Sequence, residues 1–148
     1  MSSPHDVLHV LGDQALAAGH KMLDQAAVKA SCEAAGMSHD EWFGGLVELR
    51  DRKLVQMRDY DGKVALLALT QPGLWAYVTK ARADLADVTE RLLDVLDGVE
   101  ANVAVPLGAE LGESPLLVEA LLEHLAGRRL VVFSRTGADS FRIHRFSM

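Results

Sequence analysis

The chain has 148 residues, a hydrophobic content of 49% and a formal net charge of −6. Its length allows one domain or two small ones, and its hydrophobic content suffices for a packed core, which excludes a disordered chain. No apolar run approaches the roughly 20 residues that cross a bilayer, so we expect no membrane partner. A protein held on nucleic acid mainly by phosphate contacts usually shows a basic face, and the net acidity gives no support to that class.

The cysteine content and the first residues bear on the compartment. Cys32 is the single cysteine of the chain, which excludes an internal disulfide and is typical of a reducing cytoplasm. The first ten residues, MSSPHDVLHV, lack the basic region of a secretory signal. We therefore expect a cytoplasmic protein.

The first fifty residues predict three helices. Residues 3–6, SPHD, have the pattern of a helix start, and apolar residues then follow helical spacing up to Gly19. A second helix is expected over Leu23–Ala35, where alanines would permit close packing. Residues 38–41, SHDE, form a capping box and start a third helix, whose apolar face includes Trp42 and Leu46.

From Leu54 onwards the apolar spacing changes to that of strands. Leu54–Met57 and Val64–Leu69 predict two strands, which a turn at Asp59–Gly62 joins into a hairpin. The next stretch, Thr70–Gly98, predicts one helix over about residues 72–97, because its apolar positions recur at alternating steps of four and three. Two shorter helices with a bend near Lys80–Asp84 are the alternative.

The second half of the chain predicts the same elements again. Helices are expected over Val88–Leu96, Val103–Leu111 and Ser114–Leu125, and a hairpin is expected from Leu130–Phe133 and Ser140–Phe146. Adding 76 takes Gly36 to Gly112, Ser38 to Ser114 and Arg52–Val55 to Arg128–Val131. Because one offset joins two separate motifs, we interpret the chain as a tandem repeat, with domains at 1–80 and 81–148.

Both halves resemble winged helix-turn-helix domains, with wings like those of the MarR and PadR families. The residues that carry the resemblance are the tight turns at 36–38 and 112–114 and the helix ends at 52–55 and 128–131, which lead into the hairpins. The resemblance implies a mainly α fold with small β-hairpins (α+β), made of two winged-helix domains in tandem joined by a helix. The tandem arrangement is also similar to the kleisin-interacting subunits of bacterial chromosome-organising complexes. Such domains bind DNA or protein.

In DNA-binding members of this family, the third helix enters the major groove and reads bases. Here the two third helices open with residues 39–41, HDE, and 115–119, PLLVE, which offer few base-reading side chains. The expected DNA contacts therefore lie at the helix ends and on the wings: Arg50, Arg52, Lys53, Arg58, Lys63, Arg135, Arg142 and Arg145. The alternative is a solvated rim that keeps the hairpin edges from pairing with other sheets.

A second set of residues is expected to contact a protein partner or a second copy of the chain. It comprises apolar residues of the linking helix and of the last third helix: Leu74, Val78, Leu85, Val88, Leu116 and Leu117. Sharing the apolar seam of the linking helix would join two small cores, and any exposed part of it would favour a homodimer.

The sequence lacks the motifs of common nucleotide-binding and hydrolytic enzymes, such as GxxxxGK[ST], GxGxxG, HExxH and GxSxG. His5, His9 and Asp13 share one helix face, but a metal site needs a further fixed ligand, so no metal and no cofactor are expected. The sequence thus predicts a non-enzymatic, DNA-associated regulator that uses its wings. The alternative is a protein-interaction subunit in which two winged helices dock a partner.

Overall fold

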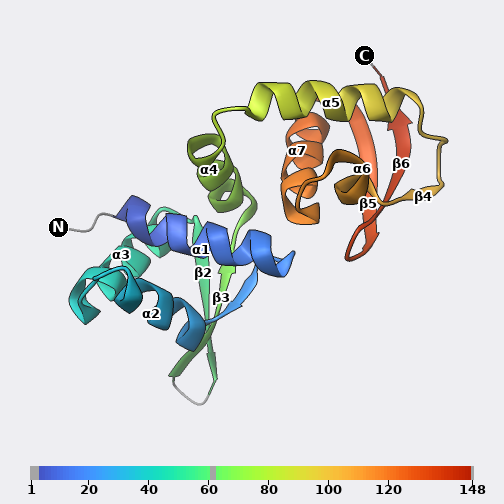
Figure 1. Cartoon of the computed structure of the whole chain (residues 1–148). Coiled ribbons are helices and arrows are strands. Elements are labelled where there is room, and N and C mark those ends of the chain that lie inside the picture. Colours follow the sequence, from blue (N-terminus) through green and yellow to red (C-terminus); the bar gives the residue numbers. More distant parts are fainter. Residues whose placement is uncertain (1–3, 61–62, 148) are drawn as a thin grey trace. The chain divides into compact units, whose positions relative to one another are not determined.

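The computed structural model describes residues 4–60 and 63–147 and shows a mixed α+β chain (Figure 1). In this described part it contains seven helices and two antiparallel sheets of three strands each. The expected mixture of helices and small β-hairpins is confirmed. The chain divides into two compact units, Met1–Ala81 and Arg82–Met148, which we call the first and the second unit.

The first unit combines four helices with one sheet. Its elements are α1 (Pro4–Ala18), β1 (Met22–Asp24), α2 (Gln25–Ala34), α3 (His39–Asp51), β2 (Val55–Tyr60), β3 (Lys63–Leu69) and α4 (Gln71–Ala81). The strands lie in the order β1-β3-β2, so β2 is an edge strand. Helix α1 packs against α2, α3 and α4, while α2 and α3 contact the sheet. Leu11, Trp42, Leu46, Leu67 and Leu74 are buried in this core.

The second unit repeats this order with three helices and one sheet. Its elements are α5 (Leu85–Asp97), β4 (Ala104–Val105), α6 (Leu107–Leu111), α7 (Pro115–Gly127), β5 (Val131–Gly137) and β6 (Ser140–Phe146). The strand order β4-β6-β5 matches that of the first sheet, so β5 takes the place of β2. Figure 1 shows α5 lying across the ends of α7 and of the β5–β6 hairpin. Leu92, Leu121 and Phe141 are buried in the core.

The offset of 76 found in the sequence is present in the backbone. Helices α3 and α7 have the same length and differ by 76 at both ends. Ser38 and Ser114 each cap their helix by accepting a hydrogen bond from a first-turn amide. Ser38 and Glu41 also complete the predicted capping box. At the helix exits Lys53 and Arg129 adopt φ values of 62° and 63°, and the amide that follows each one bonds to Leu49 O or Leu125 O.

The register of the two hairpins also differs between the units, and one of the differences lies on β6. Met57 pairs with Leu67 and, 76 residues later, Phe133 pairs with Ile143. Towards the other end of the hairpin Val55 pairs with Leu69, but Val131 pairs with Phe146, which is one residue further along. The register shift at Val132/Phe133 therefore leaves one extra residue on β6, as in a β-bulge.

The single linking helix predicted over about residues 72–97 is wrong, because α4 ends at Ala81 and α5 begins at Leu85. The alternative with a bend near Lys80–Asp84 is confirmed. Between the two helices, the guanidinium of Arg82 donates hydrogen bonds to the carboxylates of Asp84 and Glu113. Asp84 occupies the N-cap position of α5 without capping it, since its carboxylate accepts from Arg82 instead.

Two short strands were predicted as parts of helices. Leu23 lies in β1 opposite Leu67, and Ala104 lies in β4 opposite Arg142. Strands of three and two residues are too short to show an alternating pattern, so the neighbouring helical signal obscured them. Both add a third strand to a hairpin, which an isolated hairpin needs for independent stability. The predicted turn at Asp59–Gly62 falls partly on residues 61–62, outside the described part of the chain.

Candidate nucleic-acid interface

Three of the predicted basic residues gather around a hollow of about 430 Å³ in the first unit, which we call the basic hollow. It is lined by Arg50, Lys53, Val55, Gln56, Met57, Arg58 and Thr70. Arg50 lies in the last turn of α3, Lys53 lies in the connection between α3 and β2, and Arg58 lies on the edge strand β2. No carboxylate lines the hollow, so these described residues make it a cationic site in an acidic chain.

The backbone that carries Lys53 is fixed from both sides. Its amide donates to Arg50 O at 2.9 Å, and its carbonyl accepts from the Thr70 hydroxyl at 2.8 Å. Thr70 Oγ1 in turn accepts from Gly73 N at 3.1 Å. A side chain at Gly73 would collide with Leu54 O, because an ideal Cβ would lie 2.0 Å from it. The close approach of α4 therefore holds the exit of α3 in place.

The other two cations are placed by helix α3 and strand β2. Arg50 Nη1 lies 3.9 Å from Met57 Sδ, and its Nη2 lies 3.4 Å from Asp51 Oδ1. Both members of that ion pair are mostly exposed, so it neutralises Arg50 only weakly. Arg58 is exposed on β2 opposite Leu66. Its side chain and that of Lys53 thus remain available to a ligand.

The remaining predicted contacts of the first unit do not join the hollow. Arg52 pairs with Glu48 at 2.6 Å across one turn of α3. The side chain of Lys63 lies outside the described part of the structure. The start of α3 carries the exposed acid Asp40 and a ring stack of His39 on Phe43. This helix start therefore offers no cation to a phosphate.

In the second unit Arg135 is a structural residue, which removes it from the predicted DNA contacts. Its guanidinium lies 2.8 Å from Glu119 Oε2, donates to Ala138 O at 2.6 Å and sits over the ring of Phe141. The side chain is only 17% exposed. Arg142 and Arg145 are exposed on β6, as the sequence predicted.

A carboxylate that the sequence analysis missed anchors the second hairpin. Asp139, in the β5–β6 turn, accepts from Gly108 N at 2.7 Å and from Ala109 N at 3.0 Å. A side chain at Gly108 would lie 2.7 Å from the carboxylate, so glycine is required there. An acid in a hairpin turn is common, and only the tertiary contact reveals its role.

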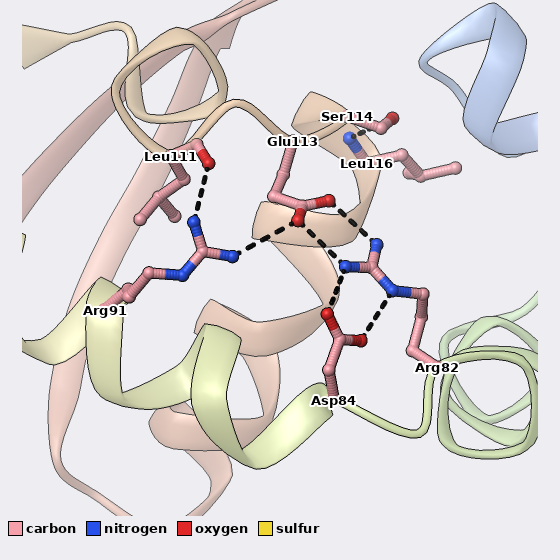
Figure 2. A network of polar contacts seen from close by, with 7 residues as sticks. All are labelled: Arg82, Asp84, Arg91, Leu111, Glu113, Ser114 and Leu116. Carbon is pink, nitrogen blue, oxygen red and sulfur yellow. Dashed lines mark hydrogen bonds and ion pairs between the residues drawn. The ribbon is translucent and has the colours of Figure 1, made fainter.

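A polar network, drawn in Figure 2, ties the residues before α5 to the α6–α7 turn within the second unit. Arg82 forms two 2.8 Å bonds to the Glu113 carboxylate and two more to Asp84. Arg91 contacts Glu113 Oε1 at 3.4 Å and donates to Leu111 O. The hydrogen bonds from Arg82 lower the pKa of Glu113 and of Asp84, and they raise the pKa of Arg82. No local pattern predicts this network, because its members lie up to 31 residues apart along the chain.

The apolar residues predicted to contact a partner are mostly core residues. Leu74, Val78, Val88, Leu116 and Leu117 have no exposed surface, whereas Leu85 is partly exposed. Leu74 and Val78 lie on α4, and Val88 lies on α5. These buried residues stabilise the fold and are not accessible to a partner. Helix α7 is buried at seven of its positions, which leaves it little surface for reading bases.

The remaining residues that the sequence analysis considered are Cys32 and the histidines of α1. Cys32 is buried, and burial raises the pKa of its thiol. Among the described residues no three His, Cys, Asp or Glu side chains are grouped as a metal site, and His9 contacts Asp13 at 3.2 Å. None of the helices in the described part combines the length and apolar character that a membrane crossing requires.

Comparison with known proteins gives no assignment. No protein-family model matches the chain, and no curated protein matches it.

Proposed function

We propose that the two units are winged helix-turn-helix domains in tandem, and that the protein is a non-enzymatic, DNA-associated regulator. Each unit has a helix, a short strand, two helices and a hairpin, and the short strand pairs with the last strand of the hairpin. This order and this pairing support the domain assignment. The observation that carries DNA binding is the basic hollow, where Arg50, Lys53 and Arg58 meet without a lining carboxylate.

The charges favour contacts to the phosphate backbone over contacts to bases. Guanidinium and ammonium groups on an exposed edge bind phosphate oxygens whatever the sequence, and such contacts position a protein on the duplex. Base reading needs polar side chains on a helix that enters the groove. Asp40 stands at the exposed start of α3, and α7 is largely buried. We therefore expect binding with little sequence preference.

The salt dependence of duplex binding tests this function. Fluorescence anisotropy of a labelled duplex gives the slope of log K against log salt, which falls by about one for each phosphate contact removed. We expect the double variant Lys53→Asn/Arg58→Gln to reduce the slope by about two. Asn tolerates the left-handed backbone at position 53, so the fold is preserved. Absence of wild-type binding at about 50 mM salt would refute the DNA function.

A second candidate function, docking of a protein partner, is favoured by an exposed apolar side chain on an edge of the second sheet. Val132 on the edge strand β5 is 44% exposed. The offset of 76 places Val132 at the position of Gln56 in the first unit. A large apolar side chain exposed on an edge strand can add to a contact with another chain.

Self-association is the form of this second function that can be tested directly. Sedimentation equilibrium of the wild type should show a homodimer, and Val132→Asp should shift it to the monomer without affecting the core. A wild-type protein that stays monomeric at high micromolar concentration would exclude the homodimer.

A further inference from the structure

We propose that the basic hollow is a discrete site for one phosphate group, and that it takes a free phosphate ester as well as a backbone phosphate of DNA. For the nucleic-acid source the inference rests on the proposed function. For a free ester it depends only on the residues of the hollow.

The walls of the hollow match the chemistry of a phosphate ester. Arg50, Lys53 and Arg58 provide cationic N–H donors, and Gln56 adds an amide on the same rim. A phosphate monoester carries close to two negative charges and three strong acceptor oxygens. Charge-assisted hydrogen bonds of this kind are about twice as strong as neutral ones.

The floor of the hollow suits the carbon skeleton of an ester. Met57 is half-buried and presents apolar surface among the lining residues, and the almost fully buried Val55 lies next to it in the lining. The thioether of Met57 adapts to irregular shapes. With about 430 Å³ the hollow falls within the usual range of small-molecule sites, about 300–1,000 Å³. A sugar phosphate therefore fits better than a bare inorganic anion.

The second unit provides an internal comparison for the same backbone positions. Adding 76 to Arg50, Gln56 and Arg58 gives Ala126, Val132 and Ser134. Adding 76 to Lys53 gives Arg129, so the helix exits share their φ, their hydrogen bonds and one exposed cation. The cations at Arg50 and Arg58 have no counterpart in the second unit, so they are a property of the first unit and not a requirement of the fold.

The comparison also weighs against a basic rim that only protects the sheet edge. Strands β2 and β5 are both edge strands. Edge protection would favour exposed charge on both. On β5, however, Val132 is exposed and Arg135 is tied to Glu119. Beside β2, in the described part of the chain, Lys53 and Arg58 are exposed and line the hollow together with Arg50, which points to a ligand.

An NMR titration of the full chain tests the site. Backbone amide shifts are followed while inorganic phosphate or adenosine monophosphate is added. We expect saturable shifts at Lys53, Gln56 and Arg58, with tighter binding of the nucleotide because its sugar covers the apolar floor. Lys53→Asn and Arg58→Gln should each weaken nucleotide binding by about tenfold, which is the loss of one charge-assisted contact.

Arg129→Asn is the matched control, because Arg129 has the same backbone conformation and the same exposed setting in the second unit. It should leave nucleotide binding unchanged. Shifts spread evenly over the exposed arginines of both units would overturn the proposal, since they would show only diffuse ion binding. Unchanged affinity in Arg58→Gln would overturn it as well.

Duplex anisotropy on the same variants separates this inference from the proposed function. Saturable nucleotide binding without duplex binding would support the phosphate site and refute the DNA function. Duplex binding that is unaffected by Lys53→Asn and Arg58→Gln would refute the site and leave the DNA function to other residues. Competition of adenosine monophosphate with the duplex would support both.

Discussion

In the first unit Arg50, Lys53 and Arg58 line an open hollow. In the second unit the corresponding positions hold Ala126, Arg129 and Ser134, so one of the three cations is kept. The most buried arginine of the second hairpin, Arg135, pairs with Glu119 and donates to the turn carbonyls of Gly137 and Ala138. Both units nevertheless share the helix caps, the left-handed helix exits and the strand order. The same fold therefore carries exposed cations around a hollow in one unit and uses an arginine for internal contacts in the other. Function must be inferred from side chains at matched positions.

The largest expected effect on stability comes from truncating a buried leucine at matched positions of the two cores. Leu49 and Leu125 are related by the offset of 76, and both are buried. We expect Leu49→Ala and Leu125→Ala each to lower the free energy of unfolding by about 2–5 kcal/mol, because each leaves a cavity. Calorimetry then shows whether the units unfold together. If each variant lowers a separate transition, the units are independent, and a single transition lowered by both would show one cooperative fold.

The next effect concerns the arginine that the second unit holds internally. Arg135→Met keeps the apolar stem but leaves Glu119 without this partner. We expect a loss of about 2 kcal/mol, because a half-buried carboxylate then lacks its counter-charge. The double variant Arg135→Met/Glu119→Leu should recover most of that loss. Duplex binding should not change in either variant, and a lower salt slope would show that Arg135 contacts DNA after all.

A smaller effect should distinguish the units by their response to acid. At the position of Glu113 the first unit has the buried Met37. The pKa of Glu113 is lower in the folded chain than in the unfolded one, so its contribution is present above about pH 4.3. It is lost as the pH falls through the folded-state pKa, and Asp84 acts in the same direction.

We expect the acid-labile contribution of Glu113 to be about 1 kcal/mol, because this carboxylate is only partly buried. Denaturant titrations between pH 3 and pH 7 measure it, and Glu113→Gln should flatten the profile. An unchanged pH profile in this variant would show that other carboxylates cause the acid sensitivity.

The smallest expected effect tests the feature that the units share. Replacing Lys53 or Arg129 by glycine relieves the left-handed backbone, which is unfavourable for any residue with a Cβ. Each change should raise the free energy of unfolding by about 0.5 kcal/mol, the net of that relief and of the greater freedom of an unfolded glycine. Only Lys53→Gly should weaken phosphate binding. Equal weakening by both variants would end the distinction between the two copies.

Local signals in the sequence predicted local structure well. The capping box at Ser38 and the glycines at 36 and 112, which follow the predicted helices, depend on neighbours in the chain, and the structure shows both features. The contacts of Arg82 after the end of α4 involve Glu113, and the internal position of Arg135 involves Glu119. Both glutamates lie far from their partners along the chain. No spacing rule contains such partners, so the sequence placed Arg135 with the exposed cations.

The alanines of α2 show the same limit for packing. Ala26, Ala27, Ala30 and Ala34 suggested a close contact with another helix, but the structure leaves all four exposed. Small residues permit a close approach without causing one, and burial is decided by the larger side chains Val28 and Cys32. In the candidate site, the sequence identified the three cations but not the hollow that they line, because β2 and the end of α3 meet only in the folded unit.

The extra residue on β6 is a place where the strand register of the second unit differs from that of the first. Pairing identifies it as one of His144 and its neighbours, since Ile143 keeps the common offset and Phe146 has moved by one. The ring of His144 contacts Ser134 Oγ, on β5, at 2.9 Å and Asn102 Oδ1, shortly before β4, at 2.7 Å. A shift of one residue inside a strand normally moves every later side chain to the other face of the sheet. Here the bulge confines the shift to one position, so Val131 and Ile143 both stay buried on the same hairpin.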